Sequence, residues 1–488
     1  MKNIIEMAEG VQGFEIDKAQ DLFFSMLSFS PRNSYYLSVQ DKYEHLMDTY
    51  KELPPLVALA LSYYTCKTLG RRLAPNLVMT DVLYRSEEGN LRQLAKYVLE
   101  QCFTRPDFIT TSVQYVMDTA NKKSIKHVPS YMKKAYKRCL QNMDDVTLKK
   151  QKLEKNDITV ADLIKAFRPN PNKSRLKNLT YVDFIERNKN TKLTNTEDEK
   201  VVSLNATISN DKITFEEKKK VITKNIKNFG ATDIIRNLSN IECTDENKSL
   251  IEDTLRKTIN SKNGLRKLNP FDLIIENYEN VHQDFIDILD KIIIEWTKNQ
   301  CSLEQEYTIL LDMSGSMWQQ NGINGAKFLS LIINCINKYN VLVYNERIVE
   351  HHSTKVKQII DENKHSPNKL FKILSEYISE NAYNGTCTRT STMKAVKMYP
   401  NSNILLITDE FSYDDVDSAE SLQECVKNNL IVFNCEWSGA SAFSITERML
   451  RISGFQAQIL NAINSLENFD NFVQNIVLDL LNSFSNKK

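Results

Sequence analysis

Residues 307–322 read YTILLDMSGSMWQQNG, an apolar run followed by a short polar loop that begins with an aspartate. The first five residues, YTILL, combine β-branched and large apolar side chains, which is typical of a buried strand. The loop then places Asp312, Ser314 and Ser316 at alternate positions. In an open α/β sheet, ligands bind beyond the carboxyl ends of the strands. The stretch therefore predicts a strand of an α/β sheet with a binding site at its end.

Apolar runs similar to this strand recur later in the chain, separated by stretches with helical periodicity. The further strand candidates are VLVYN (341–345), NILLIT (403–408) and LIVFNC (430–435). The helical stretches between them include GAKFLSLIINCINKY (325–339) and NKLFKILSEYISE (368–380). Buried strands that alternate with helices are typical of a mostly parallel, doubly wound sheet. We therefore predict an α/β domain over residues 301–488.

The chain before residue 300 carries repeated helical signals instead. One apolar stripe at helical spacing comprises Leu91, Leu94, Val98, Leu99 and Cys102. ELPPLVALALSYYTCKTLG (52–70) has prolines at its start and Gly70 at its end, as helix boundaries often do. Successive amphipathic helices without strand-like alternation predict stacked helix pairs. We predict an all-α, HEAT-like repeat domain over residues 1–300, with a loop or linker insertion at 188–225, where NKNTKLTNTEDEK (188–200) has one apolar residue.

Composition restricts the class of protein. The chain has 488 residues, of which 41% are hydrophobic and 26% charged, so we expect globular domains with a heavily solvated surface. Its nine cysteines form no C-x-x-C pair, and an odd number suits free thiols in a reducing compartment. We find no apolar run of about 18 residues and no leader-like segment, and therefore expect a cytoplasmic protein that does not enter a membrane.

Two further loops of the predicted sheet carry oxygen donors. Asp409 directly follows NILLIT, and the segment NGTCTRT supplies Thr386. Carboxylate and hydroxyl oxygens are hard donors that suit Mg²⁺ or Mn²⁺. Taken singly, Ser314 and Ser316 could merely cap the next helix, and Asp409 could merely end a strand. Their order along the chain, on the expected elements, leads us to predict a metal site.

The region over residues 300–488 resembles a von Willebrand factor A (vWA) domain. The metal-ion-dependent adhesion site of that family combines a D-x-S-x-S loop with a threonine and a later aspartate. The resemblance implies that the metal ligands here are Asp312, Ser314, Ser316, Thr386 and Asp409. Thr388 is the second choice for the threonine. The resemblance also implies that the metal can recruit an acidic ligand from a protein partner.

Most of the chain is similar to the TROVE family, typified by the Ro ribonucleoprotein autoantigen. In the vWA-like part the similar pieces are TILLDMSGSM, VLVYNERIVE, LLITDEFSY, LIVFNCEWSG and ERMLRISGFQAQILNAI. In the helical part they are KKAYKRCL, DLIKAFRPNP, FGATDIIRNLSNIE and GLRKLNPFDLIIENYE, in the family's order. The resemblance implies a ring of helical repeats followed by the vWA domain. It also implies binding of small structured noncoding RNAs on the outer ring surface and of single-stranded RNA ends in the central hole.

The distribution of charge supports an RNA partner independently. Residues 122–177 contain 16 Lys or Arg against 5 Asp or Glu, a net charge of +11 in a chain whose total is +1. The rest of the chain is therefore net −10. Phosphate neutralisation dominates nucleic-acid affinity, so this concentration predicts a polyanion partner.

The helix after Pro129 shows how this charge is arranged. A core stripe of Met132, Ala135, Tyr136, Cys139 and Leu140 leaves the basic side chains pointing outward. The like charges four residues apart each cost a few tenths of a kcal/mol in a free helix, which favours an anionic partner over an ordinary solvated face. Our candidate RNA-binding residues are Lys122, Lys123, Lys133, Lys134, Lys137, Arg138, Lys165 and Arg168. Family members carry a histidine near the position of Arg168, so the particular RNA stays open.

Two other groups suggest chemistry that we do not adopt. His351 and His352 follow a predicted strand in a polar stretch, and we interpret them as a surface pair rather than metal ligands. Cys387 lies beside Thr386, but no histidine is placed to activate it, and we interpret it as a structural thiol.

Three classes of function remain. The leading hypothesis is a non-enzymatic, monomeric RNA-binding ring. The alternative is a metal-dependent protein-interaction module with the helical domain as scaffold. A metal-dependent hydrolase has less support, because three hydroxyls and two carboxylates are a weakly anionic set for phosphoryl chemistry.

Overall fold

The computed structural model describes residues 4–6, 12–15, 17–29, 38–143, 158, 160–169, 214–261, 268–276, 278–300, 303–318, 320–414, 429–437, 440–443, 449–454 and 469–486. By packing, the chain forms two compact units. One comprises Met1–Thr49 and Thr223–Phe472, and the other comprises Tyr50–Ile222 and Val473–Lys488. These units follow tertiary contacts, whereas the boundary predicted near residue 300 follows the change in sequence pattern.

The unit that contains residues 50–222 is built from stacked helices. They are α3 (Pro55–Lys67), α4 (Leu73–Arg85), α5 (Asn90–Cys102), α6 (Pro106–Thr119), η2 (Ile125–His127), α7 (Ser130–Asn142) and α9 (Val160–Phe167), with most of α12 (Phe215–Asn225) and of α23 (Phe469–Ser485). Each of the helices α3, α4 and α5 packs against the helix two places further along the chain, and α9 packs on α6 and α7. Such contacts between neighbouring repeats produce the stacked helical pattern that the sequence predicts.

Local sequence signals in this unit behave as expected. Gly70 ends the α3 region with a φ of 75°, a left-handed conformation that glycine adopts without a Cβ penalty. The apolar stripe of α5 is buried at Leu94, Val98, Leu99 and Cys102, whereas Leu91 in the first turn is half-buried. The helix α7 buries all five residues of its predicted stripe.

The other unit contains α1 (Lys18–Ser28) and most of α2 (Val39–Lys51), and it resumes with a second group of helices. After the last residues of α12, this group comprises η4 (Ile226–Asn228), α13 (Ala231–Asn237), η5 (Leu238–Asn240), α14 (Asp245–Ile259), η6 (Pro270–Leu273), η7 (Tyr278–Asn280) and α16 (Gln283–Gln300). The helix α14 packs against α16, and α16 packs against helices of the sheet region. Of the predicted insertion at 188–225, the described residues 214–225 include the helix α12, and the remainder lies outside the described residues.

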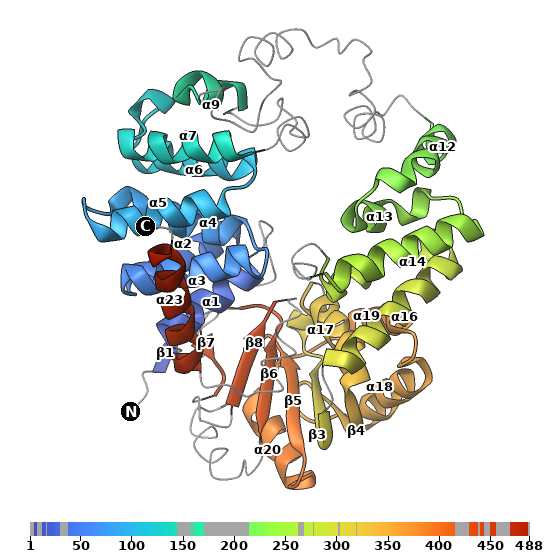
Figure 1. Cartoon of the computed structure of the whole chain (residues 1–488). Helices are drawn as coiled ribbons and strands as arrows, with labels where there is room; N and C mark the ends of the chain where they lie inside the picture. The colour runs from blue at the N-terminus through green and yellow to red at the C-terminus, as the bar shows by residue number, and fades with distance from the viewer. Residues whose placement is uncertain are drawn as a thin grey trace. The chain divides into compact units, whose positions relative to one another are not determined.

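The sheet of this unit has five parallel strands in the order β4-β3-β5-β6-β8 (Figure 1). They are β3 (Leu303–Asp312), β4 (Ile336–Tyr344), β5 (Asn403–Thr408), β6 (Leu430–Asn434) and β8 (Met449–Ser453). The helices beside them are η8 (Gly315–Trp318), α17 (Gln320–Ile332), η9 (Ile333–Cys335), α18 (Glu350–Asn363), α19 (Pro367–Asn381) and α20 (Thr388–Met398). The predicted doubly wound α/β architecture is confirmed. The strand β8 was not predicted.

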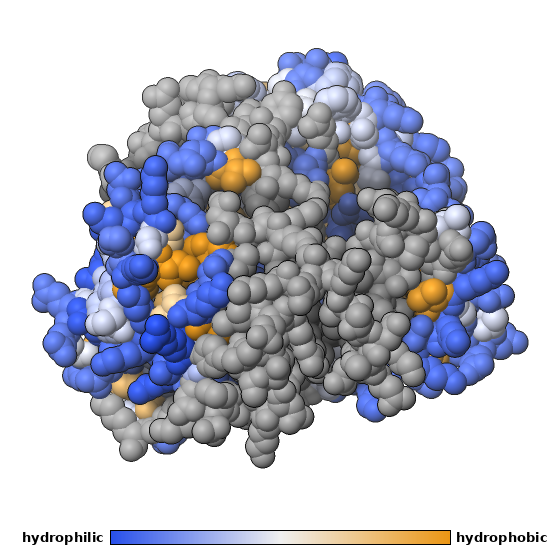
Figure 2. Space-filling model, turned by 90° about the horizontal axis from the view of Figure 1, so that it is seen from above, coloured by the Kyte–Doolittle hydropathy of each residue, from blue (hydrophilic) through white to orange (hydrophobic). Residues whose placement is uncertain are grey.

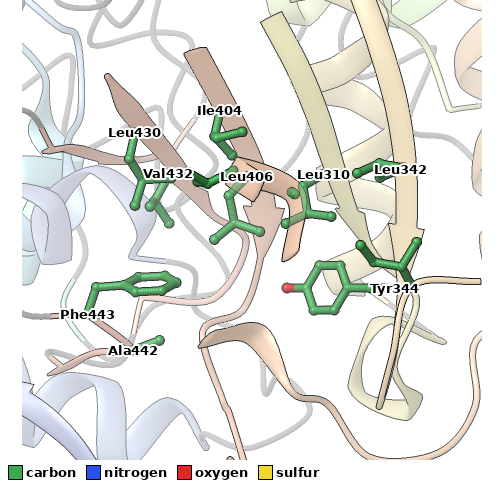
Figure 3. Packing of buried hydrophobic residues seen from close by; sticks show 12 residues of the cluster. Leu310, Leu342, Tyr344, Ile404, Leu406, Leu430, Val432, Ala442 and Phe443 are labelled. Atoms are coloured by element: carbon green, nitrogen blue, oxygen red, sulfur yellow. The ribbon is translucent and has the colours of Figure 1, made fainter. Parts of the chain in front are cut away.

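Both faces of the sheet are covered by helices. Leu310, Leu342 and Leu406 pack on one face with Ala395 and Val396 of α20. Figure 3 shows this layer, in which side chains of β4, β3, β5 and β6 lie side by side and Ala442 and Phe443 lie at the β6 end. On the other face, Phe328 of α17 stacks on Phe433 of β6 at 3.9 Å between ring centroids. Alternate residues of the buried parts of the strands therefore face different helices, which explains why successive residues there are apolar.

One boundary differs from the prediction. The helical pattern at 325–339 continues through residues that form η9 and the start of β4, so α17 ends at Ile332. Residues from Ile336 onward pair with β3, at Leu303 and then from Glu306. Pairing with a distant strand thus overrides a local helical pattern.

A small antiparallel sheet lies in the region that was expected to be free of strands. The strands β1 (Ile4–Glu6), β2 (Gln12–Glu15) and β7 (Ala440–Ser441) pair in the order β1-β2-β7. The expectation was wrong here because the register joins Phe14 to Ser441, a pairing between distant parts of the chain that no local pattern encodes. This pairing places the N-terminal segment and the vWA-like region in the same unit.

The surface and the cysteines agree with the composition. On the face seen in Figure 2, the described residues are mostly hydrophilic, and hydrophobic ones form small separate patches. Within the described ranges, no helix combines the length and the apolarity needed to span a bilayer. The seven described cysteines are free thiols, and five of them are buried.

Candidate metal centre and basic helical surface

Three loops of the parallel sheet region bring the five predicted metal ligands together. Asp312 is the last residue of β3, and Ser314 and Ser316 lie in the turn that enters η8. Thr386 belongs to the loop between α19 and α20, and Asp409 follows β5. All five side chains are buried, with residue exposures between 0% and 4%.

Asp312 is surrounded by hydroxyl groups. Its Oδ1 accepts a hydrogen bond from the Ser314 backbone N–H at 2.8 Å. Its Oδ2 accepts from the Thr408 hydroxyl at 2.7 Å, and at longer range from the hydroxyls of Tyr344 (3.3 Å) and Thr386 (3.4 Å). The Ser314 and Ser316 hydroxyls lie 3.1 Å apart. One carboxylate thus lies among oxygen atoms from three loops.

Asp409 is the second buried carboxylate. Its Oδ1 accepts from the Phe411 backbone N–H at 3.3 Å, and its Oδ2 accepts from Asn321 Nδ2 at 3.3 Å. Burial, reinforced by the negative charge of Asp312, raises the pKa of Asp409 to about 8. Burial likewise raises the pKa of Asp312. The hydrogen-bond partners named for these two carboxylates are all neutral.

The donor set suits a divalent cation. Burial raises the pKa of both carboxylates, and the charge of Asp312 raises that of Asp409 further, while none of the named hydrogen-bond partners supplies a compensating cation. A divalent ion would supply that positive charge. Three hydroxyl oxygens complete a set of hard ligands of the kind that Mg²⁺ and Mn²⁺ take. The residues that could hold such an ion are Asp312, Ser314, Ser316, Thr386 and Asp409.

Backbone hydrogen bonds join the three loops. The N–H of Gly315 donates to the carbonyl of Asn384 at 2.9 Å, and the N–H of Tyr383 donates to the carbonyl of Met313 at 3.2 Å. The N–H of Tyr413 donates to the carbonyl of Thr386 at 2.9 Å. Because these hydrogen bonds join backbone to backbone, they fix the loops that carry the candidate ligands relative to one another.

The chain turns sharply beside two ligands. Asn384 has a φ of 64° and Glu410 a φ of 62°, in the left-handed region that side chains other than glycine rarely adopt. Glu410 is stabilised there by its carboxylate. This group pairs with the guanidinium of Arg451 and accepts from Ser441 Oγ at 2.8 Å and Asn434 Nδ2 at 2.5 Å.

Sequence reasoning missed several residues of this centre. Thr408 and Tyr344 donate to Asp312 from the last positions of β5 and β4, and Asn321 links Asp409 to Glu436, whose Oε2 accepts at 3.0 Å. A position at the carboxyl end of a neighbouring parallel strand was the signal that could have found Thr408 and Tyr344. Thr388 lies 3.3 Å from Thr386, hydroxyl to hydroxyl, and reaches Asp312 only through Thr386 or Tyr344.

His351, His352 and Cys387 were not assigned to a site from the sequence. His351 is exposed, but His352 is buried in α18, and its Nδ1 lies 2.7 Å from the Tyr377 hydroxyl. The interpretation as a surface pair was therefore wrong for His352, because the helix turns it inward. Burial, with help from Asp414 and Glu346, raises the pKa of the Cys387 thiol, so it stays protonated at neutral pH.

The predicted RNA-binding residues lie on elements that pack together in the helical unit. Lys122 and Lys123 are exposed between α6 and η2, and Lys165 and Arg168 are exposed at the end of α9. Both η2 and α7 contact α9, and η2 contacts α6. On α7 itself, Lys134 and Arg138 are exposed, whereas Lys133 and Lys137 are half-buried. We call these eight residues the basic helical surface.

Contacts between α5 and α7 beside this surface could not be inferred locally. Arg138 pairs with Glu100 of α5 at 3.0 Å, so an acidic group does reach α7 from another helix. Arg92 of α5 lies over the Tyr131 ring of α7 at 4.3 Å, and Lys96 lies 5.7 Å from the same ring. Two more cations beside an exposed edge of α7 were missed because they belong to a helix predicted only for its apolar stripe.

Comparisons with known proteins support the fold. No protein-family model matches the sequence, and no curated protein matches it. Among solved structures, the crystal structure of the Ro (RSR) protein of Deinococcus radiodurans is similar, with a TM-score of 0.56 and 13% sequence identity. The match covers 92% of this chain and 99% of that one. The chain therefore has the fold of a Ro protein, in which helical repeats are combined with a vWA-like parallel sheet, as the resemblance to the TROVE family implied.

Proposed function

We propose that this protein is a non-enzymatic RNA-binding protein of the Ro type. It binds small structured noncoding RNA on the basic helical surface and takes single-stranded RNA ends into a monomeric ring of helical repeats. Such binding serves RNA quality control or a ribonucleoprotein in the cytoplasm. The observation that carries the proposal is the positive charge concentrated between Lys122 and Lys177, net +11 in a chain of net +1. The shared fold with a Ro protein supports it.

The physical argument is electrostatic. Lys134, Lys165 and Arg168 are exposed and lie on or at the end of helices that contact one another, so their charges add. The charge of Arg138 is offset by its ion pair with Glu100. Phosphate groups neutralised by such side chains release counterions, and this release dominates affinity at low salt. Arg92 and Tyr131 add a guanidinium group and an aromatic ring beside this surface. Groups of both kinds stack on RNA bases in other RNA-binding proteins.

A salt series tests this proposal. We expect a structured RNA with a free single-stranded end to bind wild-type protein with an affinity that falls steeply with salt. The variant Lys133→Glu/Lys137→Glu should bind far more weakly. It should also lower the salt slope by about 2, because each of the two lysines would no longer neutralise a phosphate.

A matched control tells whether RNA binding depends on where the lysines lie or only on the net charge of the protein. Lys394 and Lys397 are exposed on α20, in the other unit, and Lys394→Glu/Lys397→Glu changes the net charge by the same amount. We expect that variant to bind RNA as wild type does. Equal losses in both variants, or a flat salt response of the wild type, would contradict the proposal.

A second function is favoured by the metal centre. We propose that Asp312, Ser314, Ser316, Thr386 and Asp409 hold Mg²⁺ or Mn²⁺ and that this site recruits an acidic group of a protein partner. The observation that carries this proposal is the pair of buried carboxylates with raised pKa and neutral partners. A bound divalent ion supplies a coordination position for an anionic oxygen. With two carboxylates against three hydroxyls, the site suits recognition better than phosphoryl transfer.

The two functions are separable by experiment. Chelation of divalent ions should abolish protein-partner binding and leave RNA binding on the basic helical surface intact. Asp312→Ala should have the same selective effect. RNA cleavage that requires Asp312 would show that the protein is a hydrolase and overturn its assignment as a non-enzymatic protein.

A further inference from the structure

Three aromatic side chains are exposed on the loops that carry the metal ligands. Trp318 is 51% exposed, Tyr383 43% and Tyr413 52%. They account for three of the six exposed large hydrophobic side chains in the described part of the chain. We call these three residues the aromatic rim. Large aromatic groups left in water around a polar site are a feature of binding surfaces rather than of ordinary solvated ones.

Each rim residue is close in sequence to a ligand, and the two tyrosines are anchored by main-chain hydrogen bonds. Trp318 follows Ser316 by two residues at the end of η8, and Tyr383 precedes Thr386 by three. The backbone N–H of Tyr383 donates to Met313, and that of Tyr413 donates to Thr386. Tyr383 and Tyr413 are therefore held by the same hydrogen bonds that join the loops of the metal centre.

Local packing orients two of the rings. A Cβ at Gly385 would lie 3.4 Å from Cδ2 of Tyr413, so this ring lies against the loop that carries Thr386. The Tyr383 ring lies 6.3 Å from the buried imidazole of His352, centroid to centroid. Gly385 is adjacent to Thr386 and leaves room for the Tyr413 ring.

The charges around the rim select the class of ligand. Residues 313–318 and 382–388 contain no charged side chain, and residues 409–414 contain only acidic ones. Of these acids, Glu410 is paired with Arg451, and the backbone and hydroxyl of Thr390 donate to Asp414. On the neighbouring loop, Glu346 and Arg347 are both exposed and offset each other. Without an excess of exposed cations, a polyanion such as RNA gains little here, whereas a single carboxylate is satisfied by one metal ion.

We propose that the aromatic rim is the docking surface for a protein segment that presents one acidic side chain flanked by apolar or cationic side chains. The acidic group binds at the metal centre, and its neighbours lie on Trp318, Tyr383 and Tyr413. Aromatic rings bury large area at low cost in conformational entropy and accept cations over their faces, which explains the flanking chemistry. This inference rests on the proposed metal-dependent recognition and specifies its partner.

Peptide selection tests it. Short random peptides displayed on phage are selected on the full-length protein in saturating Mg²⁺ and eluted with a chelator. We expect the enriched peptides to contain one Asp or Glu beside apolar or cationic residues. Binding of an enriched peptide should quench or shift the fluorescence of Trp318. Trp296 and Trp437 are only 7% and 5% exposed, so a change in solvent-exposed tryptophan emission reports on the rim.

Variants separate the rim from the metal centre. Trp318→Ala/Tyr413→Ala should weaken an enriched peptide by roughly tenfold or more. It should leave binding of Mn²⁺ alone, measured by calorimetry, unchanged. Met398 is 48% exposed on α20, outside the three loops, and Met398→Ala is the matched control that should leave both unchanged.

The outcomes are distinct. If wild-type protein binds no Mn²⁺, the proposed metal-dependent function fails and the rim proposal fails with it. If Mn²⁺ binds but no acidic peptide is enriched, or if enriched peptides bind the rim variant as tightly as wild type, the rim proposal alone is overturned. It is also overturned if single-stranded RNA, rather than peptide, changes Trp318 emission in a Mg²⁺-dependent way.

Discussion

Glu410 and Arg451 form an ion pair in which both side chains are fully buried, and Glu410 directly follows the metal-ligand candidate Asp409. The Arg451 guanidinium also lies 3.9 Å from the centroid of the Trp437 ring. Trp437 Nε1 donates to Asp21 of α1 at 2.7 Å. A chain of buried polar contacts thus connects the loop after β5 with the N-terminal helix of the same unit.

Removal of one partner of this pair should destabilise the unit strongly. Arg451→Met leaves the Glu410 carboxylate buried without its cation, which typically costs about 3 to 5 kcal/mol. The double variant Glu410→Gln/Arg451→Met removes both charges and should recover much of that loss. Chemical denaturation followed by Trp437 fluorescence measures both. A double variant no more stable than Arg451→Met would show that the pair contributes through packing alone.

The metal centre should distinguish two neighbouring threonines. Thr386 donates to Asp312, whereas Thr388 contacts Asp312 only through Thr386 or Tyr344. Thr386→Val should therefore weaken Mn²⁺ binding by tenfold or more, about 1.4 kcal/mol, and Thr388→Val should weaken it by less. Calorimetry with Mn²⁺ measures the difference. Equal effects would mean that Thr388 is a ligand in its own right.

The Asp409 carboxylate should bind metal but destabilise the metal-free protein. In the absence of metal, its carboxylate is buried beside Asp312, and burial disfavours its charge. Asp409→Asn should thus raise the melting temperature of chelator-treated protein while abolishing Mn²⁺ binding. A lower melting temperature in the variant would show that the buried Asp409 carboxylate does not destabilise the metal-free protein.

Asp290 should make stability depend on pH. This buried residue of α16 accepts from the backbone N–H of Asn368 at 2.9 Å and from its side chain at 2.7 Å. Burial raises its pKa from 3.8 to about 6, in spite of these hydrogen bonds. The unfolded state therefore loses the proton first, so this group lowers stability as the pH rises from about 4 to about 6.

Asp290→Asn should remove that dependence. Near neutral pH the variant should be more stable than wild type by at most about 3 kcal/mol, and near pH 4 the difference should vanish. Urea denaturation at both pH values measures it. Asp287 is exposed on the same helix, and Asp287→Asn is the control. A wild type that becomes more stable between these pH values relative to Asp290→Asn would contradict the sign.

Gly322 should be irreplaceable at the start of α17. A Cβ there would lie 2.2 Å from the Met317 carbonyl oxygen and 2.8 Å from Ile378 Cγ2. Gly322→Ala must therefore displace η8, and with it Ser316, so we expect a loss of about 1 to 3 kcal/mol and weaker Mn²⁺ binding. Gly230, where the nearest atom to a Cβ is 3.8 Å away, offers Gly230→Ala as a nearly neutral control.

Several features could be predicted from sequence because they depend on local periodicity. The stripe of α7 is buried residue for residue, since side chains three and four apart share one face of any helix. The strand β5 begins and ends where NILLIT does, because its apolar side chains face a helix on either side of the sheet. The sequence also predicted that Asp312 and Asp409 would lie near each other, since the carboxyl ends of parallel strands meet at one edge of the sheet.

Other features could not be predicted because they join residues that are distant in sequence. The pairing of β2 with β7 overrode the expectation of an all-helical first half, and the hydrogen bond of Thr408 with Asp312 requires β5 to lie beside β3. Glu100 reaches Arg138 only because α5 packs on α7. Sequence alone thus determined the apolar stripes of the helices, the strands β3, β4, β5 and β6, and the oxygen donors that follow them, because backbone geometry converts local spacing into a shared face. Tertiary structure alone decided which charges are compensated, which hydroxyls surround Asp312 and which aromatic rings stay in water, because these depend on contacts that close only when distant segments pack.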